Sequence, residues 1–103
     1  MSMGIGINAG VPDAGRQNGR LRPAACGVWF TSTGTVMPKV LKFEDEEGMI
    51  RMMEHVHVST SEKKYYCGIP VMEYQCSAQY YGMVCQFKLF YYMERNEWKI
   101  LLD

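Results

Sequence analysis

Two histidines and three evenly spaced cysteines are the candidates for site chemistry in this 103-residue chain. His55 and His57 lie two residues apart, so a β-strand would project both from one face, the geometry in which a His-x-His pair can hold a metal ion. Cys67, Cys76 and Cys85 recur every nine residues. No Cys-x-x-Cys pair, the usual mark of a zinc site built on cysteine, accompanies them. We therefore expect no metal site and no cofactor, with His55 and His57 as the only weak candidates for metal ligands.

The thiols are expected to be reduced. Residues 1–25 show no cationic start followed by an apolar run of signal-peptide length, and no segment is long enough to span a bilayer. This pattern predicts a cytoplasmic protein without membrane contact, in a compartment that keeps thiols reduced. Cys76 and Cys85 fit small apolar core positions, whereas Cys67, which follows Lys63 and Lys64, is the best candidate for a redox-active thiolate.

No catalytic set is recognisable. Nucleophilic catalysis needs a nucleophile, a base and an orienting group, and the only two histidines have no motif partner. The acidic run at residues 44–47 fits a solvated hairpin tip better than paired catalytic carboxylates. No glycine-rich loop follows a strand and opens a helix. The sequence therefore predicts a protein that is not an enzyme.

Paired tyrosines indicate binding instead. Alternation in a strand forces one member of each adjacent pair away from the core, and exposed tyrosine gives a large contact area at low entropic cost. They could equally be rim residues of cross-strand ladders. Two functional classes follow: a protein-interaction or structural module, which could also self-associate through an open sheet edge, and a small barrel that stacks nucleic-acid bases. The candidate binding residues are Tyr65, Tyr66, Tyr80, Tyr81 and Tyr92.

The charge distribution favours the protein-interaction module. Residues 1–26 carry Arg16, Arg20 and Arg22 against Asp13, whereas the rest of the chain holds two more acidic than basic side chains. Nucleic-acid binding normally requires a basic surface. Convergence of Lys39, Lys42, Lys88 and Lys99 beside exposed tyrosines would reverse this ranking.

The elements that must position these residues are short apolar and aromatic runs separated by turn signals. They predict an all-β fold, an antiparallel meander of about six strands that curls into a barrel or half-open barrel. The expected strands cover residues 27–31, 36–44, 49–59, 65–79, 82–93 and 97–102. Pairing of the first and last strands would give a small barrel, and the alternative is a curled open sheet with Lys99 and Pro38 at its rims. Residues 1–26, rich in glycine, are expected to form a flexible tail before a domain spanning residues 27–103.

Turn residues set two registers. A turn at Glu47-Gly48 would place Phe43 opposite Met52. In the 49–59 strand, Met53 has the wrong parity, so either it faces outward or a bulge shifts the strand. For the hairpin around residue 81, a turn at Tyr80-Tyr81 would pair Cys76 with Cys85, whereas a turn at Tyr81-Gly82 would pair Cys76 with Phe87. Glycine at the second turn position favours the latter register.

The sequence also resembles a group of short all-β proteins of Gram-positive bacteria and their conjugative, transposon-like elements. The resemblance covers residues 27–103 and is carried by a pattern of hydrophobic and turn positions: Val28-Trp29-Phe30, Gly34, Pro38, Phe43-Glu44-Asp45, Gly48, Ile50, Tyr74, Gly82, Leu89, Tyr91 and Trp98. It implies a bacterial protein, of a mobile element or its host, and no activity. Cys67, Cys76, Cys85 and the two histidines depart from the pattern.

Overall fold

Seven antiparallel strands make up the part of the chain that the computed structural model describes, residues 15 and 20–102. The all-β prediction is confirmed, with one strand more than expected. The strands are β1 (Leu21–Phe30), β2 (Val36–Glu44), β3 (Ile50–Met53), β4 (His57–Tyr66), β5 (Ile69–Tyr80), β6 (Met83–Tyr92) and β7 (Glu97–Leu102).

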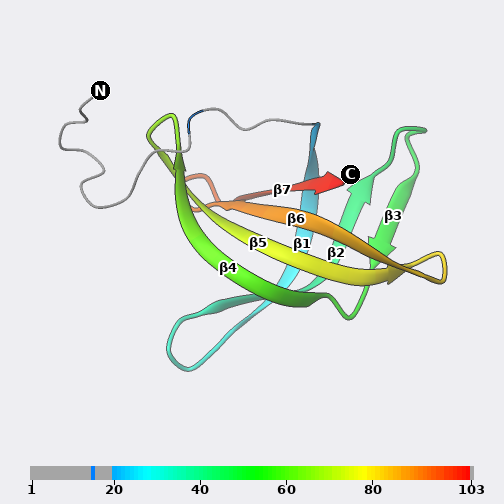
Figure 1. Cartoon of the computed structure of the whole chain (residues 1–103), viewed down its shortest axis with the longest axis horizontal. Coiled ribbons are helices and arrows are strands. Elements are labelled where there is room, and N and C mark those ends of the chain that lie inside the picture. Colours follow the sequence, from blue (N-terminus) through cyan, green and yellow to red (C-terminus); the bar gives the residue numbers. More distant parts are fainter. Residues whose placement is uncertain (1–14, 16–19, 103) are drawn as a thin grey trace.

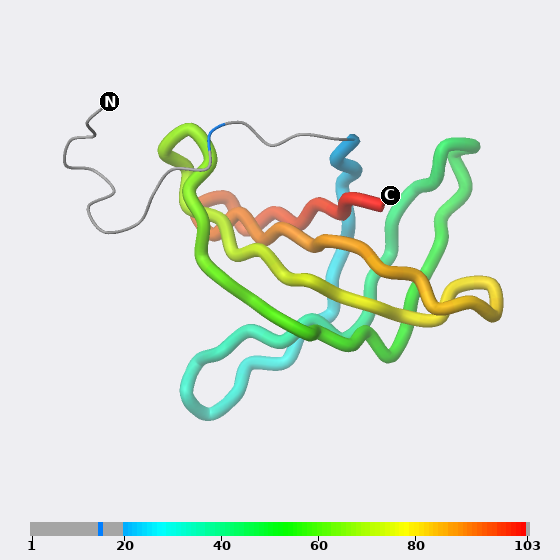
Figure 2. The backbone as a smooth tube through the Cα atoms, in the orientation of Figure 1, coloured from blue at the N-terminus to red at the C-terminus, as the bar shows by residue number. Residues whose placement is uncertain are grey.

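The strands form one sheet in the order β3-β2-β1-β7-β6-β5-β4. The first and last strands pair, with Leu21 opposite Leu101, but this pairing leaves the barrel half-open, because β3 and β4 do not pair with each other. The sheet curls into a half-barrel, so that β4, β5 and β6 run across β1 and β2 in Figure 1, as the tube of Figure 2 also shows. Its two edges are β3 and β4, which are consecutive in the chain but do not pair. We call the gap between these edges the seam.

The first strand begins earlier than predicted. Residues 21–26, assigned to the tail from their composition, form more than half of β1 and pair with both β2 and β7. Cys26 lies opposite Leu41 within this ladder. The folded region therefore includes at least residues 21–102, and the predicted flexibility of residues 1–14 and 16–19 lies outside the described residues.

The position predicted for the turn between β4 and β5 is wrong. The expected break between the 49–59 and 65–79 strands, where Ser59–Glu62 are turn-favouring residues, lies inside β4, whereas the chain reverses at Cys67-Gly68. Both turn residues have positive φ, 51° and 83°, as a two-residue hairpin turn of type I′ requires. The polar residues of β4 reflect its position at a sheet edge rather than a turn.

The predicted 49–59 strand is broken into β3 and β4. His55, with φ of 54°, lies in the left-handed region, and residues 54–56 are outside both strands. This break resets the alternation, so Met53 and Val56 are both buried. The parity shifts midway, as one alternative predicted, but through a break in the strand rather than a bulge, and Met53 does not face outward.

One of the two predicted hairpin registers is confirmed. The turn at Tyr81-Gly82 places Cys76 opposite Phe87 and Cys85 opposite Ala78. The Glu47-Gly48 turn is wrong, because Phe43 lies opposite Arg51 rather than Met52. Asp45 is the cause: its Oδ1 accepts hydrogen bonds from the backbone N–H groups of Glu47 and Met49, each at 2.9 Å. This arrangement adds a residue to the loop and turns Met52 outward, because a slip of one residue reverses the face of each side chain.

Most of the core lies on the inner, concave face of the sheet. Buried side chains from both arms of the half-barrel meet there: Leu41, Phe43, Met53, Val56, Tyr74, Cys76, Ala78, Phe87, Leu89 and Ile100. Trp98 packs against them and stacks between two tyrosine rings, with its centroid 4.5 Å from that of Tyr91 and 5.9 Å from that of Tyr74. A smaller cluster of Val71, Phe90 and Tyr92 lies on the outer face of β5 and β6.

A bulge in β2 fastens the seam at one end. The register shifts between Gly27 and Val28, and this leaves Lys39 without a partner residue in β1. The carbonyl oxygen of Lys39 instead accepts a hydrogen bond from the backbone N–H of Val56, at 3.1 Å. The β3–β4 connection is therefore tied to β2, and the side chain of Lys39 is redirected, as bulges commonly do.

Candidate binding surfaces

The five tyrosines predicted to bind a partner occupy different environments. Tyr81 is 71% exposed at the β5–β6 turn, and its ring centroid lies 4.6 Å from that of the half-buried Tyr80. Tyr65 is half-buried near the end of β4, with the Nζ atom of Lys63 5.5 Å from its ring centroid. Only Tyr81 and its neighbour Tyr80 adjoin a larger exposed apolar area.

Tyr66 and Tyr92 belong to the outer cluster rather than to an exposed surface. Tyr92 is buried beneath two cations, the guanidinium of Arg95 at 4.9 Å and the Nζ atom of Lys99 at 5.2 Å from its ring centroid. The hydroxyl of Tyr66 donates a hydrogen bond to Glu73. Both tyrosines therefore have structural contacts that a binding role would disrupt.

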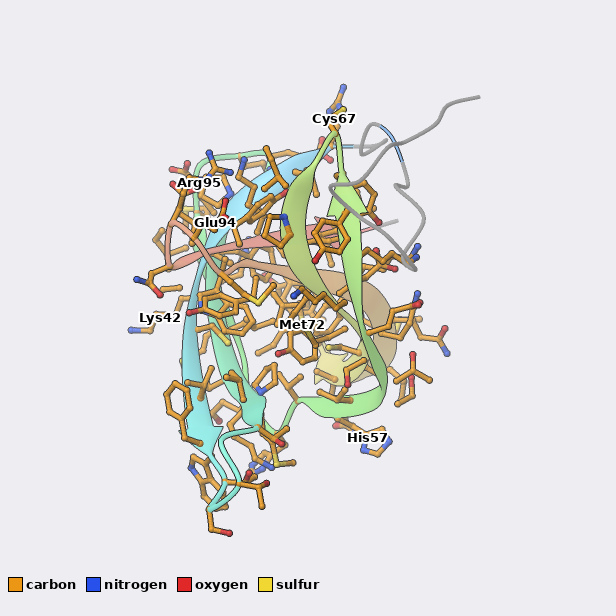
Figure 3. All side chains as sticks on the ribbon, turned by 90° about the vertical axis from the view of Figure 1, so that its left-hand side faces the viewer. Lys42, His57, Cys67, Met72, Glu94 and Arg95 are labelled. Carbon is orange, nitrogen blue, oxygen red and sulfur yellow. The ribbon has the colours of Figure 1, made fainter. Side chains whose placement is uncertain are left out.

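The histidines and cysteines do not assemble into one site. His57 begins β4 and Cys67 follows its end, and Figure 3 shows the two at opposite ends of that strand. Both histidines are exposed, but His55 lies in the bend before β4 rather than in a strand, so the predicted strand geometry is wrong. Among the described residues, no group of three or more His, Cys, Asp or Glu side chains is placed to hold a metal ion.

Burial also suppresses the reactivity of two thiols. It raises the pKa of Cys76 to about 12 and that of Cys26 to about 12, even though a backbone hydrogen bond from Lys39 acts on Cys26 in the opposite direction. Cys85 lies opposite the buried Ala78, on the core side as predicted, and is half-buried. Cys67 is exposed at its turn.

The four lysines that would have favoured nucleic acid are divided between two regions. Lys39 and Lys42 lie on β2, whereas Lys88 and Lys99 lie on the outer face of β6 and β7. The Nζ atom of Lys88 is 3.7 Å from the buried carboxylate of Glu73. These lysines do not converge beside one exposed tyrosine.

An exposed apolar surface crosses the seam where β3 meets the β5–β6 turn (Figure 1). Ile50 is 66% exposed on β3, and Tyr81 is 71% exposed at the β5–β6 turn. Between them is a hollow of about 310 Å³, lined by Ile50, Met52 and Tyr81 among others. We call this area the seam surface; it consists of Ile50, Met52 and Tyr81.

Arg51 and Asp45 hold the two sides of the seam surface together. The guanidinium of Arg51 lies 5.2 Å from the ring centroid of Tyr81, and its Nε atom is 2.6 Å from Oδ2 of Asp45. The hydrogen bond from Arg51 is the main reason why the pKa of Asp45 is lowered. Asp45 is therefore a structural member of the acidic run, and the seam surface is assembled before any partner arrives.

A second hollowed area lies on the outer side of β2. Two hollows share Val40: one of about 280 Å³ beside Gly27, Lys42 and Met52, and one of about 630 Å³ beside Trp29 and Lys39. We call the two together the outer trough. Its larger end is lined by Trp29, Lys39, Val40, Glu54, His55, Val56 and His57.

Glu73 is the polar residue that sequence reasoning missed. It is 3% exposed and binds Tyr66 through one carboxylate oxygen and Lys64, at 3.1 Å, through the other. Burial raises the pKa of Glu73, but the hydrogen bonds from Tyr66 and Lys64 outweigh burial and leave the pKa below its usual range. A single carboxylate inside the apolar run Val71–Tyr74 was the available signal.

No protein-family model, curated protein or solved structure matches this chain. The resemblance to proteins of Gram-positive bacteria and their mobile elements therefore stays a prediction. Within residues 20–102 no helix is available that could cross a membrane.

Proposed function

We propose that this domain binds another protein through the seam surface, without turnover. One observation supports the proposal above the others: three large side chains from two segments, Ile50, Met52 and Tyr81, line one hollow and keep 66%, 49% and 71% of their surface exposed. An exposed apolar patch on a folded domain commonly marks an interaction site. Met52 adds a flexible, polarisable side chain, which suits an adaptable binding surface.

The contacts around the seam favour side-chain docking over addition of a partner strand. The turn that carries Tyr81 lies against the edge of β3, where an added strand would have to pair. The partner would instead place apolar side chains between Ile50, Met52 and Tyr81. We also infer that the protein works in the cytoplasm and requires no metal or cofactor for this binding.

Site-specific photo-crosslinking in the producing cell tests the proposal. A photoreactive phenylalanine at Tyr81 should give a covalent adduct with a second protein, and the same group at exposed Glu62 on β4 serves as the matched control. The purified partner should then bind the wild-type domain and lose about tenfold or more in affinity with Ile50→Lys, because a buried charge would face apolar contacts.

Three results would overturn the proposal. The first is equal crosslinking at the two positions, and the second is an adduct consisting only of a second copy of this chain. The third is nucleic-acid binding that weakens steeply with salt, which would promote the base-stacking alternative.

A further inference from the structure

The seam surface continues into the outer trough without a break in apolar character. Met52 belongs to the seam surface and also lines the smaller hollow, where it lies beside Val40 and Gly27. Val40 then lines the larger hollow with Trp29, whose side chain is 67% exposed. A partner seated on Ile50 and Met52 can therefore extend along β2 towards Trp29.

The far end of this path is rich in groups that bind anions. Lys39 holds its Nζ atom 5.0 Å from the ring centroid of Trp29, and His55 and His57 line the same hollow. Glu54 is the one carboxylate among the residues that line it. Lys39 carries a positive charge and each imidazole can donate a ring N–H, so three groups able to bind a carboxylate face a single carboxylate of the protein.

The backbone conformation fixes the positions of Lys39, His55 and His57. Lys39 is the unpaired residue of the bulge, and its carbonyl oxygen fixes Val56 between the two histidines. His55 is held at a φ of 54°, a conformation that costs free energy for a residue other than glycine. Bulges and left-handed residues concentrate at functional sites. Here one hydrogen bond links the bulge to the strained segment.

We propose that the partner segment carries carboxylates next to its apolar residues, and that these carboxylates dock against Lys39, His55 and His57 in the outer trough. This inference rests on the proposed function and specifies the partner's chemistry as an acidic, apolar peptide segment. The apolar residues contact Ile50 and Met52, whereas the carboxylates supply charge complementarity.

A random-peptide display library, selected on the purified full chain, tests both proposals and separates them. Wild-type protein should enrich peptides that combine aliphatic or aromatic residues with Asp or Glu. Lys39→Glu should remove the acidic preference, and Ile50→Lys should remove the apolar preference. Lys63→Glu makes the same charge change on exposed β4 and should alter neither preference.

Binding of an enriched synthetic peptide should depend on the two histidines. His55→Asn combined with His57→Asn should lower the affinity several-fold, because the imidazole groups that line the hollow are lost. Asparagine tolerates the left-handed backbone at position 55. Glu54→Gln should increase affinity, because it removes the one carboxylate that would repel the peptide.

The outcomes are distinguishable. Peptides that require Ile50 but show no acidic bias, or no response to Lys39→Glu, would overturn the acidic-partner inference and leave the proposed function standing. Failure to enrich any peptide sensitive to Ile50→Lys would overturn both.

Discussion

Apolar side chains are buried on one half of the outer face of the sheet and exposed on the other half. Over β5 and β6, Val71 and Phe90 are buried, with at most 3% of their surface exposed. Over β1–β3, Trp29, Ile50 and Met52 keep between 49% and 67% exposed. Over β5 and β6, the closed half, long side chains such as Tyr66 cover the apolar residues, and Glu73 holds Tyr66 in place. We call β1–β3 the open half. The chain can therefore cover apolar residues on this face, and its open half is better explained by binding than by a general failure to bury them.

The largest expected contrast lies between two aromatic residues, one in each half. Phe90→Ala should lower the free energy of unfolding by about 4 kcal/mol, because it removes a buried ring from the closed half. Trp29→Ala should cost less than about 1 kcal/mol, since the indole is exposed and loses only its contact with Lys39. Urea unfolding followed by circular dichroism measures both. Equal costs would mean that the open half is also part of the stabilising core.

Glu73→Ala comes next and tests what closes the covered half. The substitution leaves Tyr66 and Lys64 without their shared acceptor, and we expect a loss of about 3 kcal/mol. Its control is Glu62→Ala, which removes an exposed carboxylate 3.6 Å from Lys64 and should change stability by less than about 0.5 kcal/mol. Thermal unfolding compares the two variants; a neutral Glu73→Ala would show that packing alone closes this half.

Low pH should reduce the stabilisation that Glu73 provides to the closed half. The folded-state pKa of Glu73 is lowered, so its stabilising contribution is present above the ordinary carboxyl pKa and is lost as pH falls through the lower folded value. We expect the free energy of unfolding to decrease between about pH 5 and pH 3. Glu73→Gln should flatten part of this decrease. The rest belongs in part to Asp45, whose pKa is also lowered. An unchanged profile in Glu73→Gln would contradict the assignment.

An effect smaller than those of Phe90→Ala and Glu73→Ala is expected in the open half, at Gly27. A Cβ atom at this position would lie 2.6 Å from Cγ1 of Val40, so Val40 must move when Gly27 is replaced by alanine. We expect a cost of about 1 kcal/mol, with recovery of most of it in the double variant Gly27→Ala/Val40→Ala. Urea unfolding of the three variants completes this cycle. Additive losses would show that the two side chains do not interact.

The sequence predicted the parts of the fold that depend on short-range signals. Alternating strands gave the all-β class, and Gly82 identified its hairpin turn and the register of Cys76. Cys67-Gly68 adopts the same kind of turn, but a serine- and threonine-rich segment nearby gave a more conspicuous signal. The polarity at Ser59 and Thr60 arises because β4 is an edge strand with exposed side chains, which local composition cannot distinguish from a turn.

The binding surfaces were harder to predict because they combine distant segments. Tyr81 was selected for its aromatic ring, yet its apolar neighbours on β3 come from a strand whose register depends on Asp45. His55 and His57 were recognised as unusual, but the bulge at Lys39 that brings them near Trp29 has no sequence signature. Glu73 appeared to be one polar residue in an apolar strand, and its partners became evident only from the β4–β5 pairing.

The ladder between β1 and β7 has a consequence for the order of folding. All other ladders of the sheet join strands that are neighbours in sequence, whereas this one joins residues 21–24 to residues 98–101. Closing such a long loop is entropically slow, and the β1–β3 and β4–β7 arms cannot share a core until it closes. During synthesis the first three strands therefore cannot complete the sheet until the seventh has been made.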